Sequence, residues 1–255
     1  MNKLILMVIG AVFVLLSLTG CEGIFNGIAK DKVIVKKITK EPNKNEVQYE
    51  GVLSRDAVKT VSLKAVNKYY DKKLSIDEVQ FGELLAVDQV KLKELLDRVE
   101  KGYKSHTRPR QMFAFEIDIE AELKKIPSGV FYVTLIHDAD PREVFDIVVN
   151  ARDGDVLRIN NVDQSPVVYN DVVSTLLMDE VHGVAERFIQ KKINDPLSQL
   201  TFDKKQIRWG YKPEVYYLNK ANQMIKYSVQ VQMGTKQVAG FSKDVMALLQ
   251  YYTES

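Results

Sequence analysis

The chain has 255 residues, of which 27% are charged and 45% are hydrophobic, so its composition is that of a globular protein rather than a disordered one. Its 36 Lys and Arg residues nearly balance its 34 Asp and Glu residues. This argues against a nucleic-acid partner, because a nucleic-acid-binding protein concentrates positive charge on one face. The single Cys excludes an internal disulfide framework and any zinc site built from several Cys.

The first 20 residues have the pattern of a secretory signal peptide. An uncharged apolar run from Leu4 to Leu18 is shorter than the roughly 20 residues that a membrane-spanning helix needs. Its end, Leu18-Thr19-Gly20-Cys21, resembles the lipobox of bacterial lipoprotein signal peptides, in which the Cys is obligatory. The resemblance implies that Cys21 carries a diacylglyceryl group and becomes the mature N-terminus, and two acyl chains give stable membrane anchoring. We therefore expect a signal peptide over residues 1–20, a tether over 21–32, and a lipid-anchored protein on the extracytoplasmic face of the cell membrane.

A hairpin and two helices are expected next. Residues 33–35 and 47–53 have short strand-like patterns on either side of a turn-forming stretch. A first helix is expected over residues 54–73, because apolar residues recur every three or four positions after Ser54, a favourable N-cap. A second amphipathic helix is expected over residues 87–101, just before a glycine that suits a helix end.

An antiparallel meander is expected to follow and to complete a first domain, residues 33–162. Asp153-Gly154 predicts a two-residue hairpin between its last two strands. Residues 120–125 also fit a helix. Alternating apolar residues predict strands over residues 113–119, 131–135, 145–149 and 156–159.

The second domain is expected to span residues 163–255. Ser165 and Pro166 are typical of a helix N-terminus, and apolar residues step by three or four from there to about residue 193. Residues 245–249 fit either a strand or a helix. Strands are expected over residues 200–202, 207–209, 215–218, 225–233 and 238–241.

The two halves share a pattern that indicates an internal duplication. Residues 68–74 align with residues 187–193, where each helix ends with a pair of lysines, and residues 79–81 align with residues 200–202. In each half the helix is followed by antiparallel strands. The predicted fold class is therefore α+β, with two repeated units that each pack a long helix on an antiparallel sheet.

Residues 145–157, Phe-Asp-Ile-Val-Val-Asn-Ala-Arg-Asp-Gly-Asp-Val-Leu, resemble the closing hairpin of PepSY domains. Asn150 replaces the usual Asp of that hairpin, Asp153 its Thr and Asp155 its Glu. The resemblance implies tandem PepSY-like, or cystatin-like, domains in which a helix packs on an antiparallel sheet. Members of the family are mostly extracytoplasmic. Some inhibit peptidases, and a tandem form partners a cell-wall hydrolase in spore-forming bacteria.

The resemblance implies a non-catalytic binding or regulatory module with an envelope protein as its partner, and it brings over no catalytic residue. A more specific alternative is an inhibitor or cofactor of a cell-wall hydrolase or peptidase, for example in spore germination. A second alternative is an envelope hydrolase with a metal or carboxylate site. A solute-binding protein is disfavoured, because the chain lacks the pattern of two doubly wound lobes.

The inventory of reactive residues argues against an enzyme. None of the three His lies in a His-Glu-x-x-His motif, no Gly-x-Ser-x-Gly or phosphate-binding Gly loop occurs, and Cys21 is assigned to lipid. His137 to Asp140 is the densest group of potential ligands, yet it fits a turn between strands and its spacing fails the EF-hand pattern. His182 and Glu186 fit a solvated helical pair. The alternating acids Glu116, Asp118 and Glu120 fit one solvent-exposed face of a strand. We expect no metal and no cofactor.

Aromatic residues are concentrated in the second half and provide the candidate binding residues. Tyr216 and Tyr217 are neighbours in an expected strand, so their side chains point to opposite faces and one of them is expected to be exposed. Together with Trp209 they are the residues that we expect to contact a partner, since aromatic side chains are enriched at interfaces.

Overall fold

The computed structural model describes residues 51–105, 118–162, 175–202, 207–210 and 212–253. Short 3₁₀ turns occupy Ile76–Glu78 and Leu197–Gln199, and a π-helix occupies Ile189–Ile193. The α-helices are α2 (Arg55–Tyr69), α3 (Gln89–Ser105), α4 (Ile119–Lys124), α5 (Thr175–Phe188) and α6 (Val245–Thr253). The strands are β1 (Val79–Val87), β2 (Val130–His137), β3 (Val144–Asn150), β4 (Val156–Asn161), β5 (Leu200–Thr201), β6 (Ile207–Arg208), β7 (Glu214–Asn219), β8 (Ile225–Gln232) and β9 (Gln237–Lys243).

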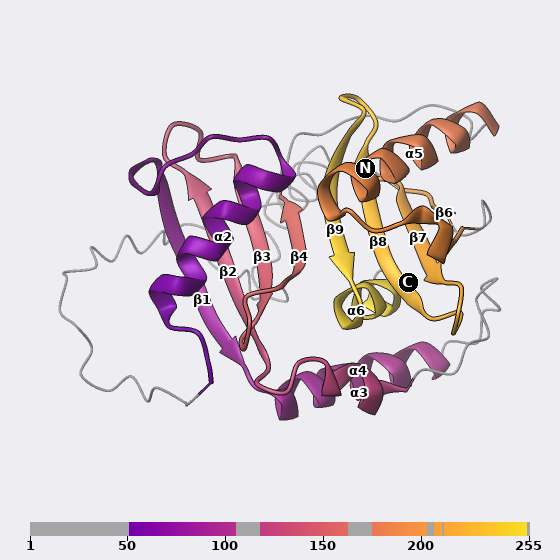
Figure 1. Cartoon of the computed structure of the whole chain (residues 1–255), viewed down its shortest axis with the longest axis horizontal. Coiled ribbons are helices and arrows are strands. Elements are labelled where there is room, and N and C mark those ends of the chain that lie inside the picture. Colours follow the sequence, from indigo (N-terminus) through magenta and orange to yellow (C-terminus); the bar gives the residue numbers. More distant parts are fainter. Residues whose placement is uncertain (1–50, 106–117, 163–174, 203–206, 211, 254–255) are drawn as a thin grey trace, which may run out of the picture. The chain divides into compact units, whose positions relative to one another are not determined.

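The described strands form one antiparallel sheet in the order β1-β2-β3-β4-β9-β8-β7-β5, with β6 paired to β7 (Figure 1). Its two halves meet where residues 158–160 of β4 pair with residues 240–242 of β9, a junction that we call the seam. The α+β class and the antiparallel pairing agree with the sequence prediction. A separate sheet for each half is not observed, because the seam makes the sheet continuous.

Helices cover both faces of this sheet. On one face, α2 lies over β2–β4 and α5 over β7–β9 (Figure 1), and their apolar residues share one core with both halves of the sheet. On the other face, α3, α4 and α6 pack against residues such as Val148 and Leu157. Strands β3 and β7 are therefore buried on both sides, which explains their almost continuous burial.

Several predicted elements are observed with shifted ends. Helix α2 begins after Ser54, whose Oγ accepts a hydrogen bond from the Ala57 N–H at 3.2 Å, as expected of an N-cap. The helix predicted over residues 166–193 is described from Thr175 onward. It widens into the π-helix and ends at Asn194, which takes a left-handed conformation with φ 63°. Residues 245–249 belong to a helix, α6.

Three details of the sequence prediction are wrong. Strand β1 continues to Val87, so the following helix begins two residues later than expected, at Gln89. Ile119 lies in α4 rather than in a strand, because the Asp118 carboxylate caps that helix by accepting from the Ala121 N–H at 2.9 Å. The β3–β4 connection is longer than a two-residue turn. The Asn150 N–H donates to the Asp155 carbonyl at 2.8 Å, and the residues between them form the loop.

The strands predicted over 33–35 and 113–117, the first part of the 47–53 strand and the helix start at Ser165 lie outside the described residues. Residues 51–53 are not in a strand, although the Leu53 N–H donates to the Ala151 carbonyl at 2.8 Å. Among the described residues, no helix is both long and apolar enough to cross a membrane.

Candidate functional site

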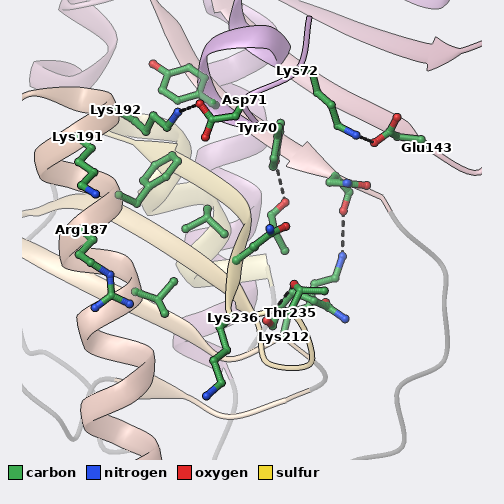
Figure 2. Close-up of a pocket in the computed structure, with 18 residues that line it drawn as sticks. Tyr70, Asp71, Lys72, Glu143, Arg187, Lys191, Lys192, Lys212, Thr235 and Lys236 are labelled. Atoms are coloured by element: carbon green, nitrogen blue, oxygen red, sulfur yellow. Dashed lines mark hydrogen bonds and ion pairs between the residues drawn. The ribbon is translucent and has the colours of Figure 1, made fainter. Parts of the chain in front are cut away.

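A cavity of about 420 Å³ opens beside the seam, and we call it the seam groove (Figure 2). Its walls come from segments far apart in the sequence: the end of α2, the start of β3, the end of β4, one face of α5 and the β8–β9 hairpin. Residues 184, 187 and 188 come from α5, and residues 191 and 192 come from the π-helix that continues it. They recur about one helical turn apart, so they lie along one side of the continuous helix.

The lining of the seam groove carries more positive than negative charge. The acidic residues of the lining are Asp71 and Glu143. Both are already paired, Glu143 Oε1 with Lys72 Nζ at 2.5 Å and Asp71 with Lys192. The basic residues of the lining are Lys72, Arg187, Lys191, Lys192, Lys212 and Lys236.

Arg187 and Lys191 differ from the other basic residues of the seam groove. Arg187 lies in the last turn of α5 and Lys191 lies in the π-helix that continues it. Both are exposed, and neither has an ion-pair partner among the described residues (Figure 2). By contrast, Lys236 Nζ pairs with Glu180 at 2.5 Å, and Lys212 Nζ donates to the Asn161 carbonyl at 2.9 Å. The groove therefore presents two uncompensated cations at one wall.

The inner surface of the seam groove is apolar, and ring packing and a hydrogen bond hold it in place. The Tyr69 ring packs against the rings of Phe188 and Phe241, with centroid separations of 5.9 and 5.7 Å. Tyr70 spans the seam, because its hydroxyl donates to the Ala239 carbonyl at 2.8 Å. Burial raises the pKa of Tyr70 far above its ordinary value, so this hydroxyl remains a donor.

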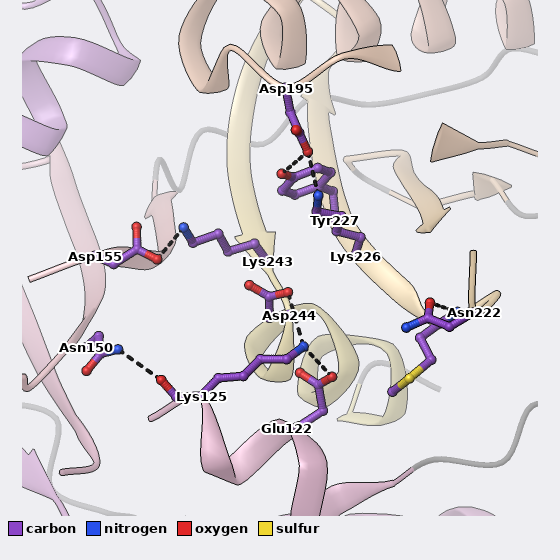
Figure 3. A network of polar contacts seen from close by, with 11 residues as sticks. Glu122, Lys125, Asn150, Asp155, Asp195, Asn222, Lys226, Tyr227, Lys243 and Asp244 are labelled. Carbon is purple, nitrogen blue, oxygen red and sulfur yellow. Dashed lines mark hydrogen bonds and ion pairs between the residues drawn. The ribbon is translucent and has the colours of Figure 1, made fainter. Parts of the chain in front are cut away.

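Ion pairs join the two halves of the chain at the other end of the seam (Figure 3). Lys125 Nζ lies 2.6 Å from Glu122 Oε1 and 3.6 Å from Asp244 Oδ1, and Lys243 pairs with Asp155. Burial raises the pKa of Glu122, and the nearby Lys125 only partly offsets this effect. These contacts connect β4 and α4 of the first half with the end of β9 in the second.

Asp195 anchors the loop after the π-helix to β8. Its Oδ2 accepts from Lys226 Nζ at 2.7 Å and from the Tyr227 hydroxyl at 2.6 Å (Figure 3). Burial by itself raises the pKa of Asp195, but these two hydrogen bonds and the charge of Lys226 outweigh it, so the net pKa is lowered. The carboxylate therefore stabilises the fold in its charged form.

The variant Asp195→Asn is expected to lower the free energy of unfolding by about 1–2 kcal/mol at neutral pH, because it weakens two hydrogen bonds to a charged acceptor. A lowered folded-state pKa means that this stability is present above the unfolded-state pKa and is lost as the pH falls through the folded-state value. The difference from wild type should thus shrink below about pH 4. Urea unfolding at several pH values measures it, and a pH-independent difference would contradict the assignment.

The structure does not support the expected exposure of the aromatic pair. Tyr216 and Tyr217 are each only 1% exposed, because α6 covers one face of β7 and α5 covers the other. The prediction that one of them faces solvent is therefore wrong, and neither offers a contact surface to a partner. Trp209 is partly buried and packs against the main core.

A buried carboxyl group that the sequence analysis missed lies next to this pair. Glu214, 1% exposed, accepts from the Tyr216 hydroxyl at 2.5 Å and from the Ser228 hydroxyl at 2.6 Å. Glu214 also lies opposite Arg208 in the β6–β7 ladder. Glu214 immediately precedes the strand predicted over residues 215–218, and its place opposite Arg208 becomes visible only in the β6–β7 ladder.

The histidines occupy separate elements of the described structure. At the end of β2, His137 Nδ1 lies 2.8 Å from Glu143 Oε2, the carboxylate that also binds Lys72. On α5, His182 stacks on the Phe202 ring with a centroid distance of 3.8 Å, and its Nε2 lies 3.4 Å from Glu186. His106 lies outside the described residues.

The remaining candidate ligands have structural partners. Asp140 accepts from the Arg142 N–H at 3.2 Å within its turn, and Glu120 pairs with Lys93. Glu116 lies outside the described residues. Within the described part of the chain, no group of three or more His, Cys, Asp or Glu side chains is arranged to hold a metal ion.

Comparison with known proteins gives no family assignment. No family model matches the chain, and no curated protein sequence matches it. The structure is similar to that of the Bacillus megaterium YpeB C-terminal domain, with a TM-score of 0.43 and 10% identity over 80% of this chain and 68% of that one. A likeness at this level assigns neither a family nor a function.

Proposed function

We propose that the protein is a non-catalytic binding or regulatory module, anchored by lipid on the outer face of the cell membrane, whose partner is an envelope protein. The observation that carries the proposal is the seam groove: a built cavity with an apolar inner surface and two uncompensated cations. Such a lining suits recognition of a ligand. General acid–base or nucleophilic chemistry instead requires a reactive group oriented by a second one.

Two features of the sequence support the remaining parts of the proposal. The lipobox that ends at Cys21 supports lipid anchoring. The PepSY-like hairpin over residues 145–157 supports a regulatory role, and it favours an inhibitor or cofactor of a cell-wall hydrolase or peptidase as the more specific form. In the structure this hairpin joins β3 and β4, and Gly154 in its loop has a φ of 75°, a conformation that favours glycine.

The variant Cys21→Ala tests the anchor. It is expected to accumulate as unprocessed precursor or to leave the membrane fraction, because the variant lacks the sulfur that receives the diacylglyceryl group. Intact-mass measurement and membrane fractionation of cells that express each form provide the readout. Wild-type protein without the added lipid mass, or a variant with unchanged mass and partition, would contradict lipid anchoring.

The partner is tested by chemical crosslinking in intact cells of the source organism, followed by purification of the tagged full chain. We expect one discrete crosslinked species that contains an envelope protein and recurs with crosslinkers of different length. A chain that yields no such species under conditions where a known envelope complex is captured would contradict the proposed function.

A further inference from the structure

We propose that the seam groove binds an acidic, extended segment of the partner protein, with carboxylates near Arg187 and Lys191 and an apolar side chain against the inner surface. This inference rests on the proposed function and names the part of the molecule that recognises the partner. It also names the chemistry recognised: a short peptide in which acidic and apolar residues alternate.

The charges of the seam groove select an anionic ligand. Six basic and two acidic side chains line it, and both acidic groups are engaged by Lys72 and Lys192. Arg187 at the end of α5 and Lys191 in the adjoining π-helix have no ion-pair partner among the described residues (Figure 2). Each lysine offers three donors and an arginine offers a planar fork that matches a carboxylate, so this wall is suited to two acidic side chains.

The inner surface of the groove distinguishes a peptide from a purely polar anion. Val184 and Phe188 of α5, Tyr69 of α2 and Val238 of β9 line the same cavity as the cations. A phosphate polymer satisfies the charges but leaves these apolar groups facing a charged ligand. A peptide with alternating acidic and apolar residues satisfies both, because successive side chains of an extended chain point to opposite sides.

The size of the groove also fits a short segment. Its volume of about 420 Å³ falls within the range of ligand-sized cavities, so it accepts part of a peptide rather than a folded domain. The groove needs little rearrangement to bind, since Tyr70 and the packed rings of Tyr69, Phe188 and Phe241 already fix its inner surface.

The test uses the full chain purified in detergent and three fluorescein-labelled pentapeptides: Asp-Phe-Glu-Leu-Asp, its uncharged counterpart Asn-Phe-Gln-Leu-Asn and its basic counterpart Lys-Phe-Lys-Leu-Lys. Fluorescence anisotropy is measured for wild type, for Arg187→Glu/Lys191→Glu and for the control Lys64→Glu/Lys101→Glu. The control changes the charge equally at exposed lysines of α2 and α3 that do not line the groove. All the substituted residues are exposed, so the fold should tolerate both variants.

We expect the acidic peptide to bind wild type and the control variant with equal affinity. Both proteins should bind the acidic peptide more tightly than the uncharged and basic peptides, and this affinity should fall as salt is added. Arg187→Glu/Lys191→Glu should weaken it at least about tenfold. Inorganic polyphosphate should compete only weakly. The inference would be overturned if the three peptides bound equally, or if both variants changed the affinity for the acidic peptide equally. It would also be overturned if polyphosphate bound more tightly than the acidic peptide.

Crosslinking separates this inference from the proposed function. If wild type and Arg187→Glu/Lys191→Glu capture the same envelope protein equally in intact cells, the groove assignment is overturned while the binding function stands. If wild type captures no envelope protein, the proposed function itself fails. Loss of a specific wild-type adduct in the groove variant, with retention in the control, supports both.

Discussion

Gly129→Ala is expected to lower the free energy of unfolding by roughly 2–5 kcal/mol. Gly129 has a φ of 76°, which an L-residue with a Cβ adopts at a cost of about 1–2 kcal/mol. A Cβ at this position would lie 2.2 Å from the Val87 carbonyl oxygen and 2.9 Å from the Asp88 Cα, so it also requires backbone movement. Because Gly129 leads directly into β2, that movement would disturb the pairing of Val130 with Val87 and add about 1–3 kcal/mol.

Gly234→Ala is the matched control for this prediction. Gly234 lies in the β8–β9 turn, has no positive φ, and has open space where a Cβ would stand. The control should change the free energy of unfolding by less than about 0.5 kcal/mol. Denaturant unfolding followed by circular dichroism measures both. Equal stability of Gly129→Ala and Gly234→Ala would show that the connection before β2 is not built as described.

Tyr216→Phe is expected to lower the free energy of unfolding by about 2 kcal/mol. The Tyr216 hydroxyl donates to the Glu214 carboxyl group at 2.5 Å, and both side chains are buried. Removing the hydroxyl takes a donor from a buried acceptor, and such a loss costs more than the hydrogen bond itself contributes. The measurement is the urea midpoint at neutral pH, with a constant slope showing that the folded state is retained.

The neighbouring variant Tyr217→Phe should behave differently. The Tyr217 hydroxyl is buried without a hydrogen-bond partner among the described residues, and burial raises its pKa strongly. Replacing it by hydrogen removes an unsatisfied polar group, so stability should stay within about 0.5 kcal/mol of wild type or increase. A loss as large as that of Tyr216→Phe would contradict the described environment of β7.

Much of the first half could be predicted because its pattern is local. The alternation of residues 131–135 and 145–149 indicates two strands, β2 and β3. The turn-forming residues between 150 and 155 indicate the connection from β3 to β4. Helix α2 could also be predicted, because its N-cap and its apolar spacing lie within one short stretch of sequence. Each of these elements depends on residues close together in the chain.

The seam could not be predicted by the same reasoning. It pairs Asn160 with Gly240, residues 80 positions apart that carry no apolar signal. A Cβ on Gly240 would lie 2.7 Å from Asn160 Oδ1 and 2.8 Å from Gln230 Oε1, so the small residue there makes room for two amide side chains. That role becomes visible only when the three strands lie side by side.

The candidate site shows the same limit. Strand periodicity correctly put Tyr216 and Tyr217 on opposite faces, but it could not show that α5 and α6 would cover both faces. Arg187 and Lys191 lie in one of the two aligned helix ends, and Asp71 and Lys72 lie in the other. That all four residues line the same groove depends on the β4–β9 pairing, which has no sequence signature.

The most direct test of a partner-binding seam groove is site-specific photo-crosslinking in living cells. A photoreactive benzoylphenylalanine replaces Gln237, an exposed residue of the groove, or Lys64, an exposed residue of α2 outside it. The prediction is a discrete adduct with an envelope protein from position 237, absent from position 64 and lost when Arg187→Glu/Lys191→Glu is added. Binding through the groove would be contradicted if both positions gave adducts in equal yield. It would also be contradicted if the adduct from position 237 formed equally well in the Arg187→Glu/Lys191→Glu variant.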